Sequence, residues 1–217
     1  MEVPPVKRLT LALAPAAAVC LAVNAFAQTA APISDKDRAA LVEYLKTTRD
    51  QVLAESATLT EAQWTFKTAP DRWSVGEVVQ HLALAESLIF DMQQKQLRAP
   101  AASIEQLAAT KGKDEMVRKM IPDRTKKVQA PEPLQPTAAA TLGGQAATIE
   151  AFRERRTKTI DYVAVTKDDL RGHVANSPLG PLDAYQWLLY MAAHSERHLA
   201  QIKEVKADPK FLKAASD

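Results

Sequence analysis

The chain has 217 residues, which is enough for one domain with a full hydrophobic core. Hydrophobic residues make up 47% of it and charged residues 25%, as in an ordinary globular protein. The formal net charge is only +2, so there is no electrostatic reason to expect nucleic acid or an anionic membrane surface as a partner.

The first 27 residues have the pattern of a secretory signal peptide. Two basic residues precede an apolar run over residues 9–23, and Ala25-Phe26-Ala27 supplies the small residues that a signal peptidase requires. A retained membrane anchor is less favoured, because Pro15 interrupts a run that is already short for a span. We therefore expect an exported, periplasmic protein with no stable membrane anchor after cleavage.

Cys20 lies within this leader and is the single cysteine of the chain. A lipoprotein anchor at Cys20 is disfavoured, since the residue before it is Val19 where a small residue is needed. Cleavage after residue 27 removes the thiol, so the mature protein has no disulfide, and any metal must bind to nitrogen and oxygen atoms.

The mature chain shows four long segments with apolar residues at helical spacing. A short tail over residues 28–33 precedes a domain over residues 34–206, and residues 207–217 form a C-terminal tail. Helices are expected from Ser34 to about Ala57, from Ser74 through Met92, from about Thr141, and from Pro181 through Val205.

The segment between the second and third of these helices has a weaker pattern. Residues 104–121 hold some helix, whereas residues 129–136 contain three prolines and form an extended connection. No pair of segments alternates with period two. The sequence thus predicts an all-α fold: a four-helix bundle with a long connection between the second and third main helices.

Two histidines lie on the inward face of the last predicted helix. His194 and His198 are four residues apart and continue an apolar row with Trp187 and Met191, so both imidazoles project from one face on successive turns. They can reach one ion without bending the backbone. Hydrogen-bonded histidines of a core, and pairs on a solvated face, remain open as alternatives.

A third histidine lies at the edge of the apolar stripe of the second helix. His81 follows the capping pair Ser74 and Glu77 by about one turn, and it could enter the same core or simply donate to a backbone carbonyl. Three neutral imidazoles with an open fourth position suit zinc, nickel or iron. The sequence permits this centre without establishing it.

These stretches together resemble the DinB-like (DinB/YfiT) superfamily of metal-dependent four-helix bundles. The resemblance covers roughly residues 34–206 and rests on three stretches, the first from Trp73 to Leu82, the second from Leu179 to Asp183 and the third from His194 to Ile202. It implies that His81, His194 and His198 are the metal ligands. Some relatives are thiol-dependent transferases or hydrolases, and the metal varies across the family.

Other residues near the predicted site have simpler roles. Trp187 and Tyr190 either line the approach or pack in the core, and Gln201 could fix an imidazole tautomer. Glu77 and Glu86 lie near His81, but capping and solvation explain them more simply, so no general base is assigned. A zincin needs a glutamate directly after the first histidine. That position holds Ser195 here, and Glu196 points away from His194.

We therefore expect an exported protein that binds one divalent metal through His81, His194 and His198 and acts on a small-molecule substrate by hydrolysis or transfer. The alternative is a bundle without catalysis that binds a small ligand or serves as a homodimer. The catalytic residues, the substrate and the metal's identity are left open by the sequence.

Overall fold

The structure is a computed structural model, and it describes residues 1–2, 32–136 and 142–213. The predicted signal peptide lies almost wholly outside the described residues. Among the described helices, none combines the length and the apolar character that crossing a membrane requires.

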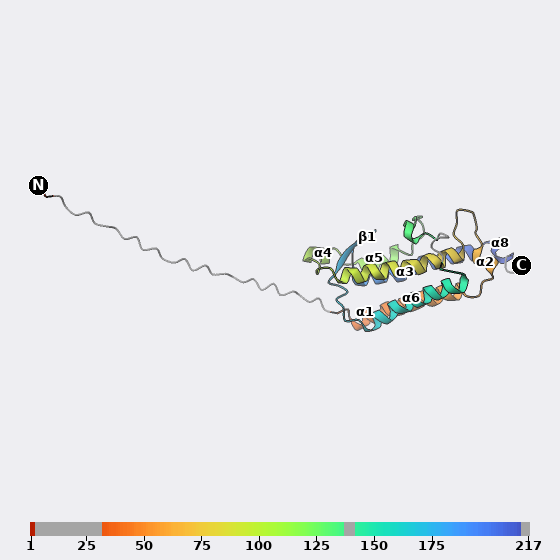
Figure 1. The fold of residues 1–217 in the computed structure, drawn as a ribbon, viewed down its shortest axis with the longest axis horizontal. Coiled ribbons are helices and arrows are strands. Elements are labelled where there is room, and N and C mark those ends of the chain that lie inside the picture. The colour runs from red at the N-terminus through yellow and green to blue at the C-terminus, as the bar shows by residue number, and fades with distance from the viewer. Residues whose placement is uncertain (3–31, 137–141, 214–217) are drawn as a thin grey trace.

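Four long helices form a bundle, as the sequence predicted (Figure 1). They are α1 (Asp35–Ser56), α3 (Val75–Leu97), α6 (Gln145–Val165) and α7 (Ala184–Lys206). The shorter elements are α2 (Glu61–Thr65), α4 (Ile104–Ala108), α5 (Lys113–Met120), the 3-10 helix η1 (Glu132–Leu134), β1 (Val174–Ser177), β2 (Gly180–Asp183) and α8 (Pro209–Lys213).

The connection over residues 98–144 makes α3 and α6 parallel neighbours. Arg155 of α6 donates to the carbonyl of Ala83, and further along both helices the rings of Tyr162 and Phe90 lie 5.5 Å apart. In α1 and α7, likewise parallel, Tyr185 donates to the carbonyl of Asp37 and Lys206 pairs with Glu55. The chain therefore does not reverse direction between α3 and α6, because the long connection returns it to the end of the bundle at which α3 begins.

Side-chain caps fix where α1, α2 and α3 begin, as they also do at α4 and α7. Ser74 and Glu77 form a capping box at α3, in which Ser74 accepts from the Glu77 amide and Glu77 accepts from the Ser74 amide. Ser34 caps α1. Thr60 and Gln63 form a second capping box at α2, and its Trp64 is buried against the first turn of α3.

The entry into α7 differs from the sequence prediction, which started this helix at Pro181. Pro181 belongs to β2, and β1 and β2 form an antiparallel hairpin that pairs Val174 with Asp183 and Ser177 with Gly180. Gly180 takes the left-handed φ of 81° that closes the turn. The helix starts at Ala184, since Asp183 caps it in a box with Gln186.

Two apolar clusters fill the two ends of the bundle, and a polar layer separates them. One cluster includes Leu45, Ile160 and Ala193, and the other includes Val52 and Phe152. Between these residues, along α1, α6 and α7 in turn, lie the buried polar residues Thr48, Arg156 and Ser195. The candidate site adjoins this layer.

The packed part of the chain continues beyond residue 206. Phe211 of α8 is only 2% exposed and meets Phe66 edge to face, with ring centroids 5.8 Å apart. At the opposite end of the bundle His173 is half-buried with its Nδ1 enclosed. Its carbonyl accepts from the side chain of Gln96 and the amide of Ala184, which ties the hairpin to α3 and α7.

Candidate metal centre

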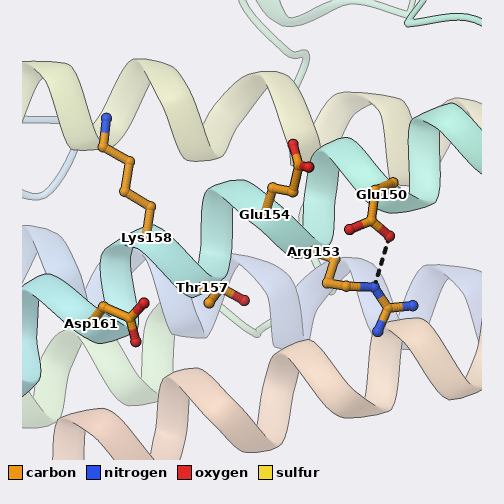
Figure 2. Close-up of a pocket in the computed structure, with 6 residues that line it drawn as sticks. All are labelled: Glu150, Arg153, Glu154, Thr157, Lys158 and Asp161. Carbon is orange, nitrogen blue, oxygen red and sulfur yellow. Dashed lines mark hydrogen bonds and ion pairs between the residues drawn. The ribbon is translucent and has the colours of Figure 1, made fainter.

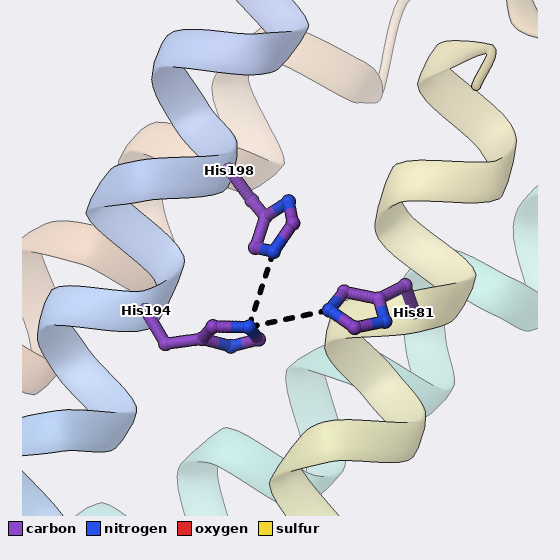
Figure 3. Close-up of side chains that lie close together, drawn as sticks. All are labelled: His81, His194 and His198. Atoms are coloured by element: carbon purple, nitrogen blue, oxygen red, sulfur yellow. Dashed lines mark hydrogen bonds between the residues drawn. The ribbon is translucent and has the colours of Figure 1, made fainter. Parts of the chain in front are cut away.

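The three histidines named from the sequence lie together between α3 and α7. His81 projects from α3, and His194 and His198 project from successive turns of α7, so that the three rings face a common point (Figure 3). His81 and His198 are buried and His194 is half-buried. Of the chain's four histidines, only His173 lies outside this group.

The ring nitrogens that meet are the Nε2 atoms. Nε2 of His194 lies 3.2 Å from Nε2 of His81 and 3.1 Å from Nε2 of His198. With metal–nitrogen bonds of about 2.0–2.1 Å, neighbouring ligand atoms of a tetrahedral zinc site would lie about 3.3 Å apart. The separations in the protein are close to that value, and every ligand atom of the group lies within 4.8 Å of the others.

Hydrogen bonds at the opposite ring nitrogens fix the tautomers of two rings. Nδ1 of His81 lies 2.7 Å from the carbonyl oxygen of Leu134, which can only accept. Nδ1 of His198 lies 2.9 Å from Oε1 of Gln201. Both Nδ1 atoms therefore carry the proton, and each Nε2 presents a lone pair toward His194.

This arrangement favours a cation at the meeting point. A proton on Nε2 of His194 could satisfy one neighbouring lone pair but not both, and without that proton three lone pairs face one another. Gln201 has the orienting role that the sequence suggested for it, and Leu134 has a matching role for His81 that the sequence did not indicate.

All three imidazoles are held in the neutral form that binds metals. Burial lowers the pKa of His81, and the hydrogen bond to Leu134 opposes that shift. Burial, followed by the charge of neighbouring imidazoles, lowers the pKa of His194 and of His198 well below the usual range for histidine. Arg156 adds to the effect at His194.

Aromatic rings enclose the histidines. The Trp73 indole lies 4.9 Å from the His81 ring and stacks on His198 at 6.2 Å between centroids. Tyr190 stacks on His194 at 6.0 Å. Trp187 is 5% exposed and packs in the core beside Tyr190. Of the two aromatics considered from the sequence, Tyr190 therefore contacts the site, while Trp73, seen in the sequence only as part of a helix start, covers two of the rings.

The nearby glutamates are already engaged. Glu77 caps α3 and pairs with Lys67. Glu196 is exposed and accepts from the Tyr44 hydroxyl, which agrees with its predicted outward direction. Glu86 differs from the prediction of a solvated side chain: it is 2% exposed and forms an ion pair with Arg156. No carboxylate joins the three histidines among the described residues.

Arg156 joins all four long helices next to the site. Its guanidinium, which has no solvent exposure, donates to Glu86 of α3 and to Ser195 of α7 at 2.6 Å. It also donates to the carbonyl of Leu45 and the hydroxyl of Thr48 on α1. Ser195 follows His194 directly, so this network fixes the turn of α7 that carries the histidine.

A separate surface depression of about 530 Å³ lies on the outer face of α6, away from the histidines (Figure 2). Its walls carry charges of both signs, and Glu150 and Arg153 form an ion pair across 3.1 Å. All its lining side chains come from one helix, and they are Glu150, Arg153, Glu154, Thr157, Lys158 and Asp161. The depression has no direct connection with the imidazole group.

Comparisons with known proteins agree with the fold. The family model described as the DinB superfamily matches residues 44–202. YuaE, an uncharacterised protein of Bacillus subtilis (strain 168), is 26% identical over 150 residues, which cover 68% of this chain and 86% of YuaE. The structure of YfiT from Bacillus subtilis matches with a TM-score of 0.56 at 13% identity, over 80% of this chain and 88% of YfiT. YfiT is described as a probable metal-dependent hydrolase with an unusual four-helix bundle topology, and at this identity the likeness shows the fold alone.

Proposed function

Because the chain belongs to the DinB superfamily, we propose that it binds one divalent metal ion through His81, His194 and His198 and promotes hydrolysis or group transfer on a small molecule. The proposal depends chiefly on the convergence of the Nε2 atoms of three neutral imidazoles. Hydrogen bonds at Nδ1 fix the tautomers of two of these rings, His81 and His198. The description of YfiT as a probable metal-dependent hydrolase supports the same reaction class.

The donor set limits the choice of metal. Three imidazole nitrogens suit zinc, nickel or ferrous iron, whereas calcium and magnesium prefer oxygen ligands. A bound divalent ion supplies Lewis acidity, which polarises a substrate oxygen and lowers the pKa of a coordinated water molecule. Three protein ligands leave at least one position open for such a molecule.

The protein's own residues orient the ligands. Leu134 and Gln201 hold the Nδ1 protons of His81 and His198, and Trp73 covers those two rings. The buried carboxylate of Glu86 is held by Arg156 and so is not placed to accept a proton from a substrate. Proton transfer in this proposal is therefore left to solvent or to the substrate itself.

Metal stoichiometry in the four histidine variants tests the proposal. The purified protein is expected to bind one equivalent of Zn²⁺ or Ni²⁺, and His81→Ala, His194→Ala and His198→Ala each to lose it while keeping helical circular dichroism. His173→Gln is the matched control, because His173 lies outside the cluster. Unchanged binding in the three alanine variants would refute the assignment.

A substrate panel then separates catalysis from simple binding. Metal-loaded protein is assayed against ester, amide and phosphoester substrates, and against thiol acceptors for group transfer, with His194→Ala as the blank. Turnover that depends on the metal and disappears in the blank supports an enzyme. Tight metal binding with a higher melting temperature and no turnover supports a structural metal site.

We also propose export to the periplasm, which is supported by the basic residues, the apolar run and the Ala25-Phe26-Ala27 sequence at the N-terminus. Cell fractionation with mass spectrometry of the mature N-terminus tests this. Recovery in the periplasmic fraction with Gln28 as the first residue is expected. Recovery in the cytoplasm with an intact N-terminus would contradict it.

A further inference from the structure

The segment over residues 121–135, here called the strap, leaves the end of α5 and contacts the helices that carry the three histidines. Its Leu134 carbonyl accepts the Nδ1 proton of His81 at 2.7 Å. The same leucine packs its side chain against the apolar cluster of the bundle. One end of the strap is thus in direct contact with a candidate ligand.

The other end of the strap reaches a second histidine through an arginine. Arg124 makes a two-pronged ion pair with Glu204 of α7, at 2.8 and 2.7 Å. Its remaining Nη1 atom donates to Oε1 of Gln201 at 3.4 Å, and that same oxygen accepts the Nδ1 proton of His198. An arginine donor at Gln201 keeps the amide oxygen, and not the amide nitrogen, turned toward the imidazole.

A further arginine of α7 fastens the middle of the strap. Arg197 donates to the backbone carbonyls of Ile121, Asp123 and Lys126, the last at 2.9 Å. These carbonyls lie in a stretch with no helix or strand of its own, so the guanidinium supplies partners that regular structure would otherwise give. Arg197 directly precedes His198, and the strap is therefore held by the turn that carries a candidate ligand.

We propose that the strap is an integral part of the metal centre and that Arg124 and Arg197 are positioning residues for its ligands. This inference rests on the proposed metal site. The strap sets the Nδ1 partner of His81 directly and that of His198 through Gln201. Since binding effects are reciprocal, an ion that selects these ring orientations also stabilises the docked strap.

Metal affinity and hydrogen exchange together test the proposal. Competition with a chromophoric chelator gives the Zn²⁺ dissociation constant of the full-length mature protein and of Arg124→Ala, Arg124→Lys and Arg197→Ala. We expect the alanine variants to bind Zn²⁺ at least about tenfold more weakly, as outer partners of ligands generally do. Arg124→Lys should recover only part of the loss, because lysine cannot make the two-pronged pair.

Arg153→Ala is the matched control, since it removes an arginine and an ion pair from the outer face of α6 without touching the strap. In the parent protein, Zn²⁺ should slow amide exchange across residues 121–135, and this protection should be absent in His194→Ala. A purely structural role of the strap would leave the Zn²⁺ affinity unchanged.

The outcomes distinguish the two proposals. If the parent protein binds Zn²⁺ and the Arg124 and Arg197 variants bind it equally well, with no metal-dependent protection of the strap, this inference is overturned and the metal site stands. If the parent protein binds neither Zn²⁺ nor Ni²⁺, the metal site itself fails and the inference fails with it.

Discussion

Arg156 of α6 and Glu86 of α3 form an ion pair that is almost closed to solvent at the centre of the bundle, with side-chain exposures of 0% and 2%. The guanidinium also reaches α1 and α7, so a single side chain contacts all three of the other long helices. Burial of two charges is costly, and the pair is stable only because its hydrogen bonds are nearly complete. The pair joins the packing of the bundle to the position of His194.

Removing one charge of this pair should destabilise the protein strongly. Glu86→Gln leaves the Arg156 charge buried without a counterion, and we expect the free energy of unfolding to fall by about 3 kcal/mol. Urea denaturation followed by circular dichroism measures the change. Glu150→Gln, which breaks the exposed pair with Arg153, should change the stability by no more than about 0.5 kcal/mol.

Replacing both charges at once should cost less than replacing one. The double variant Glu86→Leu with Arg156→Met leaves no unpaired charge, and apolar side chains of similar size often substitute for buried pairs. If Glu86→Gln were as harmless as Glu150→Gln, the pair would have no part in holding the bundle together.

A second stability prediction concerns the contact between Gly76 and Trp64. A Cβ atom at Gly76 would lie 2.5 Å from Nε1 of the buried indole. Gly76→Ala, which commonly stabilises a helix, should here lower the free energy of unfolding by roughly 1–3 kcal/mol. In a Trp64→Leu background the destabilisation by Gly76→Ala should largely disappear. Thermal melts of the parent, the two single variants and the double variant would reveal this coupling. Additive effects would show that the indole is not the obstacle.

The stability of the metal-free protein should fall as the pH is lowered from 7.5 toward 5. The pKa values of His81, His194 and His198 are lowered in the folded protein, so below the usual histidine value of 6.5 the unfolded chain binds more protons than the folded one. The contribution of these three imidazoles to the free energy of unfolding is therefore fully present above pH 6.5 and declines below it.

Denaturation midpoints at pH 7.5, 6.5 and 5.5 measure this dependence. Burial raises the pKa of Asp183 to about 6, and that carboxyl acts in the opposite direction below that pH. Comparison with His194→Gln and His198→Gln cancels the Asp183 contribution, and each variant should show a weaker loss than the parent. An equal pH dependence in all three proteins would contradict the assignment of neutral, buried imidazoles.

Much of the fold could be predicted from local patterns. The capping pair of Ser74 and Glu77 and the apolar spacing along α1, α3 and α7 are properties of neighbouring residues, and the structure confirms the helices they indicate. The convergence of His81 with His194 and His198 could also be anticipated, because His194 and His198 continue an inward face and His81 lies at the edge of another. Their metal binding remains a prediction.

The missed features depend on contacts between distant segments. Nothing in the local sequence distinguishes Arg156 from the other basic residues of α6, and only the positions of Glu86 and Ser195 on other helices make it a buried residue. Pro181 has the pattern of a first helical residue, and its pairing with Asn176 in the hairpin has no local signature beyond Gly180. The Leu134 carbonyl could not be found from side-chain identity at all, because the backbone supplies it.

The most direct measurement is anomalous scattering at the zinc edge from crystals of the mature protein grown with Zn²⁺. The account predicts one strong peak between α3 and α7, about 2.0–2.1 Å from the Nε2 atoms of His81, His194 and His198. A zinc-saturated crystal with no peak among these three rings, or with any one of them turned away from it, would contradict the proposed centre.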